Sequence, residues 1–286
     1  MNDFSDLIVE DQKINWYPGH MAKTLRQLKE KAQLADLFVI VLDARAPISS
    51  YNDTFDEIEK NKPRLFLISK KDLGDINKLK KIKERFASQD NVMLVDLKKE
   101  NTRNLILKRI EKLLIPKRLQ ERKKGLLKPR LRVFVVGVPN SGKSTLINLL
   151  AKAKKTKVGN MAGITRGQQW VNVGDIQLLD TPGLLWPNLD DQNVAVKLAI
   201  IGAIKRDVIP LDLLFNLSYS MASSFYPDKL KAMNLEPAFT SVDIYSQLIK
   251  MFERSNLTRK NFENELDKLR LMFYETCRNW TGVTYD

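Results

Sequence analysis

The feature that most constrains this sequence is the stretch LRVFVVGVPNSGKSTLINLLAK at residues 131–152. An apolar run, a glycine-rich turn and a helix-forming segment follow one another directly, and the turn matches G-x-x-x-x-G-K-[ST] at every fixed position. Glycines let backbone N–H groups turn inward around phosphates, and the N-terminus of the following helix adds a favourable dipole. The stretch therefore predicts a phosphate-binding loop, residues 137–144, between a strand and a helix.

The side chains of this loop have separate roles in holding a nucleotide. Lys143 would reach the β- and γ-phosphates, and the Ser144 hydroxyl would ligate Mg²⁺. A glycine-rich turn with an incidental lysine is the alternative, and the position between a strand and a helix argues against it. The predicted phosphate-binding residues of the loop are Asn140, Ser141, Gly142, Lys143, Ser144 and Thr145.

Two weaker motifs follow the loop in the order that a nucleotide switch requires. The sequence Asp180-Thr181-Pro182-Gly183 comes directly after the apolar run IQLL. Asp180 is placed to hold Mg²⁺ through water, and the Gly183 N–H would touch the γ-phosphate and sense its loss. Upstream, Thr165 in the stretch VGNMAGITRG would supply a second hydroxyl to Mg²⁺. Each motif alone is a weak signal, but in this order they predict a Mg²⁺-dependent switch.

A third motif bears on the base of the nucleotide. In guanine-specific sites, the Asp of N-K-x-D accepts hydrogen bonds from guanine N1–H and the 2-amino group, two donors that adenine lacks. Here Ser69-Lys70-Lys71-Asp72 ends an apolar run, so Asp72 would read guanine and the Lys70 stem would lie along the base. Ser69 stands where Asn is usual, and we expect the loss of the amide that ties this loop to the phosphate-binding loop. Asp96-Leu97-Lys98 is a poor match to the further base loop S-A-K.

The order of these motifs is informative, because the base-reading motif precedes the phosphate-binding loop, whereas ordinary small GTPases have it afterwards. Cutting the chain at another loop preserves the neighbours of each strand. The order therefore predicts a circularly permuted fold. It also places the Asp180–Gly183 switch close to the end of the α/β region, leading directly into the segment that follows.

Apolar runs alternate with amphipathic stretches along the first two thirds of the chain. The runs LADLFVIVLDARAP, RLFLISKKDL and the weaker NVMLVDLKK are separated by the helical stretches DTFDEIEKNK and DINKLKKIKERFAS, and VNVGDIQLLDTPG reads as a pair of strands. We predict an α/β fold, a parallel-rich sheet flanked by helices, over residues 1–190. Helical spacing and the lack of a convincing strand predict a smaller all-helical domain over residues 191–286.

Positive charge is concentrated in one part of the chain. Residues 108–132 carry 11 basic and two acidic side chains, whereas residues 201–286 carry 11 of each. Such a block favours a polyanionic partner, nucleic acid above all, although a solvated basic linker within the α/β domain is the alternative. RNA binding by the helical domain would need a local patch, for which the candidates are Arg254, Arg259, Lys260, Lys268 and Arg270.

Composition excludes several classes of protein. No segment offers a long uncharged apolar run, and the N-terminal stretch MNDFSDLIVEDQ is acidic, so we expect neither a membrane span nor a secretory signal. The single cysteine, Cys277, excludes an internal disulfide framework and a cysteine-rich zinc site. We expect a cytoplasmic protein.

Together these motifs resemble the circularly permuted GTPases, and within them the ribosome biogenesis GTPase A family of bacterial large-subunit assembly factors. The resemblance implies GTP hydrolysis coupled to maturation of the large (50S) ribosomal subunit, stimulation by that subunit, rRNA contacts from the helical domain, and a monomer off the ribosome. The C-terminal region fits only in length and helical character. The resemblance is carried by WYPGHMAK at 16–23, VLDARAPISSYN at 41–52, SKKD at 69–72, GVPNSGKST at 137–145, GIT at 163–165 and DTPGLLWP at 180–187.

The only histidine, His20, lies in the PGHM motif of this resemblance. GTPases commonly orient the attacking water with a Gln just after D-x-x-G, but Leu184 and Leu185 follow here. The resemblance implies that His20 orients or activates the water instead, and an imidazole that titrates near neutrality suits the role. A structural role is the alternative for a lone histidine.

The resemblance also bears on Asn140, because an asparagine in the phosphate-binding loop of related GTPases accompanies a bound K⁺. Stabilisation of the turn is the alternative role for Asn140. Two other functions stay open on the sequence. One is a GTP-gated RNA-binding switch with negligible intrinsic turnover, and the other is a P-loop ATPase, which Asp72 disfavours.

Overall fold

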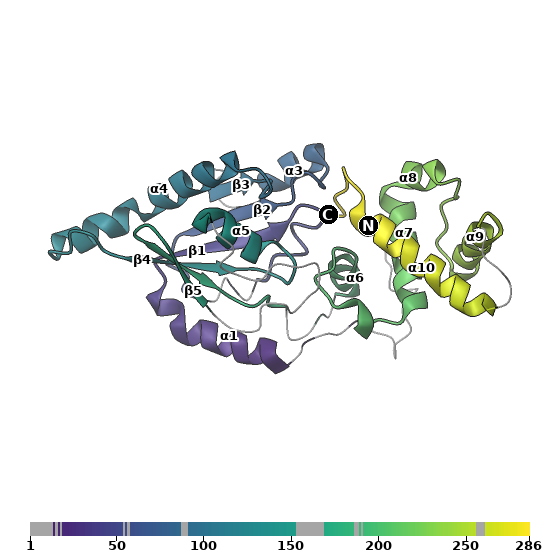
Figure 1. The fold of residues 1–286 in the computed structure, drawn as a ribbon, viewed down its shortest axis with the longest axis horizontal. Helices are drawn as coiled ribbons and strands as arrows, with labels where there is room; N and C mark the ends of the chain where they lie inside the picture. The colour runs from purple at the N-terminus through teal and green to yellow at the C-terminus, as the bar shows by residue number, and fades with distance from the viewer. Residues whose placement is uncertain are drawn as a thin grey trace.

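The computed structural model describes residues 14, 17, 19–53, 55, 58–86, 91–152, 169–185, 189, 191–255 and 261–286, without the side chain of His20. Within these residues six strands form one sheet in the order β3-β2-β1-β4-β6-β5 (Figure 1). All neighbours pair in parallel except β5, which is antiparallel to β6. The strands are β1 Leu37–Asp43, β2 Arg64–Ser69, β3 Val92–Leu94, β4 Leu131–Val136, β5 Gln169–Val173 and β6 Ile176–Asp180. The parallel-rich sheet predicted from the apolar runs is confirmed.

Strand β1 shows why the sequence forms this sheet. All of its residues are buried, as expected for a parallel strand covered on both faces. Because successive side chains point to opposite faces, Phe38, Ile40 and Leu42 join one hydrophobic cluster. Leu37 and Val39 join another on the opposite face.

Helices cover both faces of the sheet and continue beyond it (Figure 1). The helices α4 and α5 pack on one face, while α1, α3 and α6 contribute to the cluster on the other. The helices are α1 Gly19–Lys31, α3 Ile76–Lys83, α4 Asn101–Lys123, α5 Lys143–Ala151, α6 Gln192–Ile200, α7 Leu211–Phe225, α8 Pro227–Ala232, α9 Ser241–Glu253 and α10 Phe262–Asn279, with short 3-10 turns η3 Ala32–Leu34 and η5 Arg206–Val208.

Two local predictions are wrong. The basic stretch 108–132 is no linker, because residues 108–123 belong to α4, which packs Ile106, Ile110 and Leu114 at helical spacing into the core. The stretch DTFDEIEKNK does not continue as a helix, since residues 58–62 form turns and bends. The Arg64 guanidinium donates to the Phe55 and Ile58 carbonyls, which holds this loop against the start of β2.

The region after the sheet is helical, as predicted. A separate cluster is centred on Tyr219 and Phe273, whose rings stack at 5.0 Å between centroids. The core under the sheet also reaches α6, α7 and Tyr285, so the two parts share buried surface across the boundary placed at residue 190. Among the described residues, no helix is both long and apolar enough to cross a bilayer.

Candidate nucleotide-binding site

The phosphate-binding loop leaves the central strand β4 and enters α5, as the sequence predicts. The loop turns sharply, with positive φ at Gly137 (148°), Asn140 (61°) and Gly142 (102°). A Cβ at Gly137 would lie 2.3 Å from the Val41 carbonyl oxygen, so only glycine fits there. Helix α5 starts at Lys143 directly after this turn, so the loop ends at a helix N-terminus, which favours an anion.

Lys143 is buried within this loop. Its Nζ donates to the carbonyl oxygens of Gly137 (3.1 Å) and Val138 (2.7 Å). Burial lowers the pKa of Lys143 to about 8, while the Asp180 carboxylate acts in the opposite direction. A buried ammonium held only by loop carbonyls is suited to an anionic phosphate oxygen.

The side-chain oxygens of Ser144 and Asp180 lie close together beside the loop. The Ser144 Oγ lies 3.3 Å from Asp180 Oδ2. Asp180 Oδ1 is buried and has no hydrogen-bond partner among the described residues, and burial raises the pKa of this carboxyl. A hydroxyl and an unsatisfied carboxylate oxygen are the hard ligands that Mg²⁺ prefers, so these residues fit Mg²⁺. Thr165, the third predicted ligand, lies outside the described residues.

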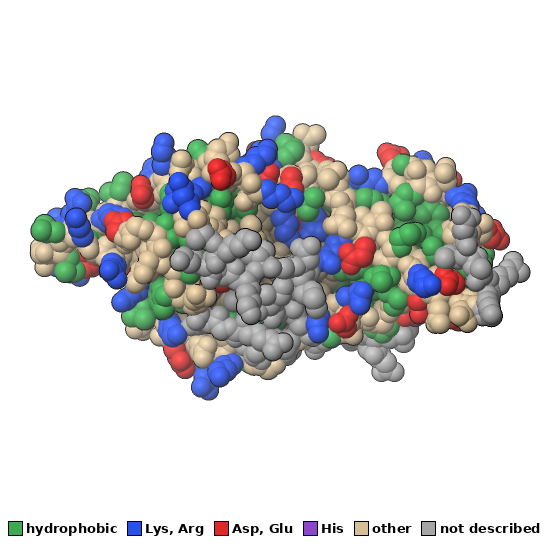
Figure 2. Space-filling model, in the orientation of Figure 1, with side chains coloured by type: hydrophobic (Ala, Val, Ile, Leu, Met, Phe, Trp, Pro, Cys, Tyr) green, Lys and Arg blue, Asp and Glu red, His purple; other side chains and the backbone are tan. Residues whose placement is uncertain are grey.

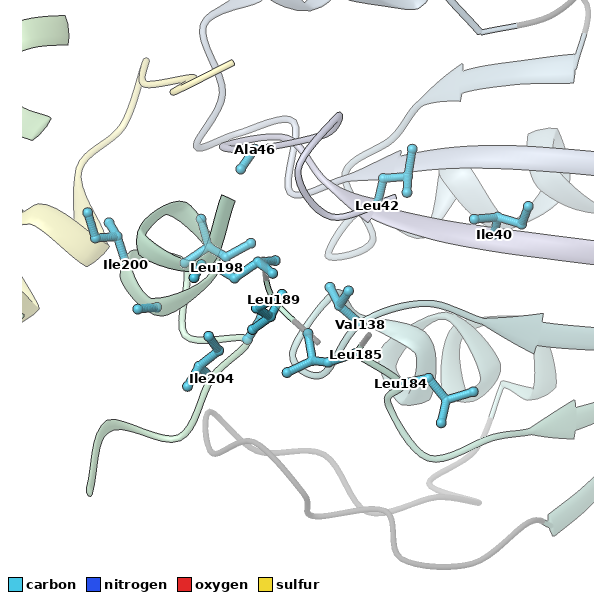
Figure 3. Packing of buried hydrophobic residues seen from close by; sticks show 14 of the residues in the cluster. Ile40, Leu42, Ala46, Val138, Leu184, Leu185, Leu189, Leu198, Ile200 and Ile204 are labelled. Carbon is cyan, nitrogen blue, oxygen red and sulfur yellow. The ribbon is translucent and has the colours of Figure 1, made fainter. Parts of the chain in front are cut away.

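The switch segment packs directly on the phosphate-binding loop. A Cβ at Gly183 would lie 2.5 Å from the Pro139 backbone, and the Leu184 N–H donates to the Gly137 carbonyl (3.1 Å). Leu184 and Leu185 are buried, and Figure 3 shows Leu185 beside Val138 beneath the loop. Leu184 and Leu185 therefore belong to the core, and neither side chain has a polar group that could orient water.

The base-reading loop is tied to the phosphate-binding loop through Ser69. Its Oγ lies 2.5 Å from the Ser141 carbonyl oxygen and 2.9 Å from that of Leu42. The expectation that serine loses this tie is wrong, because the register of β2 brings the shorter hydroxyl close enough. Lys70 Nζ lies 2.7 Å from Asp43 Oδ2, and Asp72 Oδ2 lies 2.8 Å from Lys98 Nζ.

A pocket of about 390 Å³ lies where these loops meet. It brings together the predicted residues Lys70, Asp72, Asn140, Gly142 and Thr145. Its other lining residues, which sequence reasoning did not assign, are Arg45, Leu73, Asp96, Leu97, Lys98, Ile201, Glu275, Arg278 and Asn279. The D-L-K stretch at 96–98 was an available signal, although a poor match. No sequence motif pointed to the pocket residues on α10, which are Glu275, Arg278 and Asn279.

The structure describes the backbone of the predicted catalytic histidine but not its side chain. His20 is the second residue of α1, but its side chain lies outside the described part of the chain. Ile14, which precedes this helix in the chain, contacts α6, because its N–H donates to Gln192 Oε1 (2.8 Å). Gln192 opens the helix that follows the switch segment.

A phosphate-binding loop on the central strand, an Asp at the end of the neighbouring strand and a guanine-type motif earlier in the chain define a P-loop GTPase with circularly permuted motif order. The strand order is consistent with this class. Strand β4 lies between β6, which ends in the switch, and β1, whose other neighbour β2 ends in the base-reading loop.

Comparison with known proteins identifies the family within this class. The sequence model described as 50S ribosome-binding GTPase matches residues 132–224. Ribosome biogenesis GTPase A of Priestia megaterium is 42% identical over 221 residues, covering 76% of this chain and 77% of the relative. The probable ribosome biogenesis GTPase A of Mycoplasma pneumoniae is 34% identical over 264 residues, covering 91% and 93%. The chain belongs to the ribosome biogenesis GTPase A family, and it is a GTP-hydrolysing enzyme of ribosome biogenesis.

A solved structure supports the fold independently. GDP-bound TM YlqF aligns with a TM-score of 0.63 at 24% identity, over 91% of this chain and 98% of that chain.

Proposed function

We propose that this GTPase acts on the large (50S) ribosomal subunit and drives a late step of its assembly by binding its rRNA and hydrolysing GTP. In this proposal the subunit stimulates hydrolysis, and the protein works in the cytoplasm as a monomer when off the ribosome. The observation that carries the RNA-binding part is the basic surface of α4, which the family description of 50S ribosome binding complements.

Helix α4 presents this charge at a projecting position. Its buried residues end at Leu114, and its second half extends past the sheet (Figure 1). Figure 2 shows Lys and Arg side chains along this end of the molecule. Lys117 and Arg118 pair with acidic neighbours. The basic residues of 108–132 that make no side-chain ion pair or hydrogen bond within the described residues are Lys108, Arg122, Lys123, Lys128, Arg130 and Arg132.

Three of the candidate basic residues of the helical domain already interact with protein groups. Arg254 donates to the Asn234 carbonyl oxygen (2.5 Å). Lys268 pairs with Glu265 at 2.7 Å, and Arg270 pairs with Asp267 at 2.6 Å. Because pairing within the protein offsets attraction to phosphates, we place the main RNA-binding surface on α4. Arg259 and Lys260 lie outside the described residues.

The test is a triple charge reversal on this helix, Lys108→Glu, Arg122→Glu and Lys123→Glu. Loss of three cations from an RNA interface lowers affinity for the 50S subunit at least tenfold and reduces the dependence of log affinity on log salt by about 2. Matched reversals of Lys80, Lys81 and Lys83 on α3 control for net charge. Equal weakening by both triple variants would contradict the proposed surface.

The nucleotide site of this proposal uses the residues that the sequence motifs predict. Asp72 reads guanine, Ser69 and Lys70 shape the base loop, and residues 140–145 with Gly183 bind phosphates. Mg²⁺, which GTPases generally use, neutralises charge on the β- and γ-phosphates when bound. It would be held by Ser144, Asp180 and Thr165.

Two further assignments belong to the same proposal. His20 orients the attacking water, and the Ile14–Gln192 contact supports this role by holding the segment before α1 against the helix after the switch. K⁺ binds beside Asn140 and speeds hydrolysis relative to Na⁺. The division into a GTPase domain at 1–190 and a ribosome-contacting helical domain at 191–286 also remains a proposal.

A further inference from the structure

Two side chains from the nucleotide site donate to the carboxyl end of α6. Arg45 Nη2 donates to the Ile201 carbonyl oxygen (2.9 Å), and Asn140 Nδ2 donates to that of Gly202 (2.8 Å). These carbonyls follow directly after a helix whose last residue is Ile200, where the carbonyl groups lack helical partners and the dipole is negative. The carbonyl groups that follow α6 therefore accept hydrogen bonds from side chains of the loops after β1 and β4.

Arg45 also joins two other elements. Its Nη1 donates to the Arg278 carbonyl oxygen near the end of α10 (2.8 Å). Its Nε and Nη2 form a fork on Asp43, at 2.9 Å and 2.8 Å from the two carboxylate oxygens. Both partners of this ion pair are buried, with 3% and 1% of their side chains exposed. All three guanidinium nitrogens thus donate to protein groups, which fixes the orientation of the side chain.

Asp43 connects this fork to the base-reading loop. The oxygen that accepts from Arg45 Nη2 also accepts from Lys70 Nζ, at 2.7 Å. The two cations hold the pKa of Asp43 well below its usual range, so the carboxylate stays charged despite burial. Lys70 itself adopts a positive φ of 54°, an uncommon backbone conformation for a side chain of this kind. The contact with Asp43 holds the loop in that conformation.

The turn after α6 is packed tightly from the other side. Gly202 has a φ of 76°, and a Cβ there would lie 2.8 Å from the Arg278 guanidinium. The Tyr285 N–H donates to the Arg45 carbonyl (2.7 Å), which adds a further restraint from the segment after α10. The base-reading loop is thus connected, through Asp43 and Arg45, to the helical region as well as to the sheet.

We propose that Arg45 is a positioning residue for guanine recognition, bracing the Lys70–Asp72 loop through Asp43 against the ends of α6 and α10. The inference rests on the proposed reading of guanine by Asp72. It makes the helical region a determinant of guanine affinity. Arg45 acts through Lys70, so its loss affects binding of the base more than binding of the phosphates or the chemical step.

The test substitutes Arg45→Lys, which keeps the charge but cannot maintain the fork on Asp43 and reach both carbonyls. We expect GDP affinity to fall about tenfold, the effect of losing a buried bidentate contact. Affinity for tripolyphosphate, which has no base, stays at the wild-type value. KM for GTP rises in step with the dissociation constant of GDP. The value of kcat stays within twofold of the wild type, because the lost binding energy is common to the ground state and the transition state.

Controls separate positioning from general destabilisation. Leu248→Ala removes a buried side chain from the helical core, far from this junction, and should lower the melting temperature without changing GDP affinity. If Arg45→Lys yields no folded protein, Asp43→Asn serves in its place, because it removes a carboxylate oxygen from the fork and weakens the contact with Lys70. Reduced GDP affinity and unchanged tripolyphosphate affinity are expected for it as well. Unchanged GDP affinity in the variant tested would overturn the inference, as would equal losses for GDP and tripolyphosphate.

A further variant distinguishes this inference from the assignment on which it rests. Asp72→Asn should weaken GDP binding strongly, since the amide cannot accept both guanine hydrogen bonds. If it binds GDP normally, the guanine assignment is wrong and the positioning role falls with it. If Asp72→Asn is impaired and Arg45→Lys is not, only the positioning role is overturned.

Discussion

Two buried charged residues, Lys143 and Asp180, define the electrostatics of the phosphate site. Burial shifts both pKa values toward the neutral form, downward for the lysine and upward for the aspartate. Each group therefore gains from a ligand of opposite charge, phosphate for the ammonium and a cation for the carboxylate. The charge state of both residues therefore depends on the ligand that binds between the loop and the switch.

The pKa of Lys143, lowered to about 8, predicts a pH dependence of nucleotide binding. Phosphates stabilise the charged form, so the complex holds the lysine proton to higher pH than the free protein does. Affinity is then fully present below about pH 8 and falls above it, by up to about tenfold per pH unit. Calorimetric titration of GDP between neutral pH and about pH 9 measures this. A flat or rising affinity across that range would contradict the assignment.

The switch segment and the phosphate-binding loop act as one packed element. Leu184 and Leu185 anchor the switch in the core, and Gly183 meets Pro139 with no space for a side chain. A change in the position of Gly183 would therefore require the phosphate-binding loop to adjust at Pro139.

Gly183→Ala tests this packing. The added methyl would lie 2.5 Å from the Pro139 backbone, so the loop or the switch must shift. We expect the free energy of unfolding to fall by about 1–3 kcal/mol and GTP affinity to fall with it. Denaturant unfolding and GTP titration check the two effects. Gly174→Asn is the control, since a Cβ at Gly174 meets open space. Wild-type stability and binding in Gly183→Ala would contradict the close contact.

The sequence predicts the elements whose determinants are local. The phosphate-binding loop follows from one contiguous motif, and β1 and β2 follow from short apolar runs. Helix α4 was mistaken for a linker because its charge masked the buried spacing of Ile106, Ile110 and Leu114. The tie made by Ser69 was missed because it depends on how close β2 brings the hydroxyl to the phosphate-binding loop.

The side of the pocket formed by Arg45 and by residues of α10 could not be predicted from the sequence. Arg45 and the carbonyl of Arg278 are 233 positions apart in sequence, and no local pattern links them. The α10 side chains of the pocket read as ordinary polar residues of an amphipathic helix. Only the packing of the helical region against the carboxyl ends of the central strands brings them to the nucleotide site.

Viewed as a whole, the molecule places its nucleotide pocket where the sheet meets the helical region. The C-terminal segment strengthens this junction, since Asp286 Oδ1 pairs with Lys197 at 2.9 Å and Asp286 Oδ2 accepts from the backbone of Ile48 and Ser49. The basic helix α4 projects past the sheet on the side away from the helical region (Figure 1). The proposed RNA-binding helix and the nucleotide pocket are thus separate surfaces, so the proposed stimulation by the 50S subunit requires coupling between them.

The measurement that tests this account most directly is GTP turnover by the wild type and by His20→Ala, with and without large ribosomal subunits, alongside GTP affinity. The account predicts that subunits accelerate the wild type but not the variant, while both bind GTP equally, because His20 orients water and the subunit completes the site. Normal stimulation of the variant would contradict the role of His20. Absence of any stimulation in the wild type would contradict the proposed coupling to the subunit.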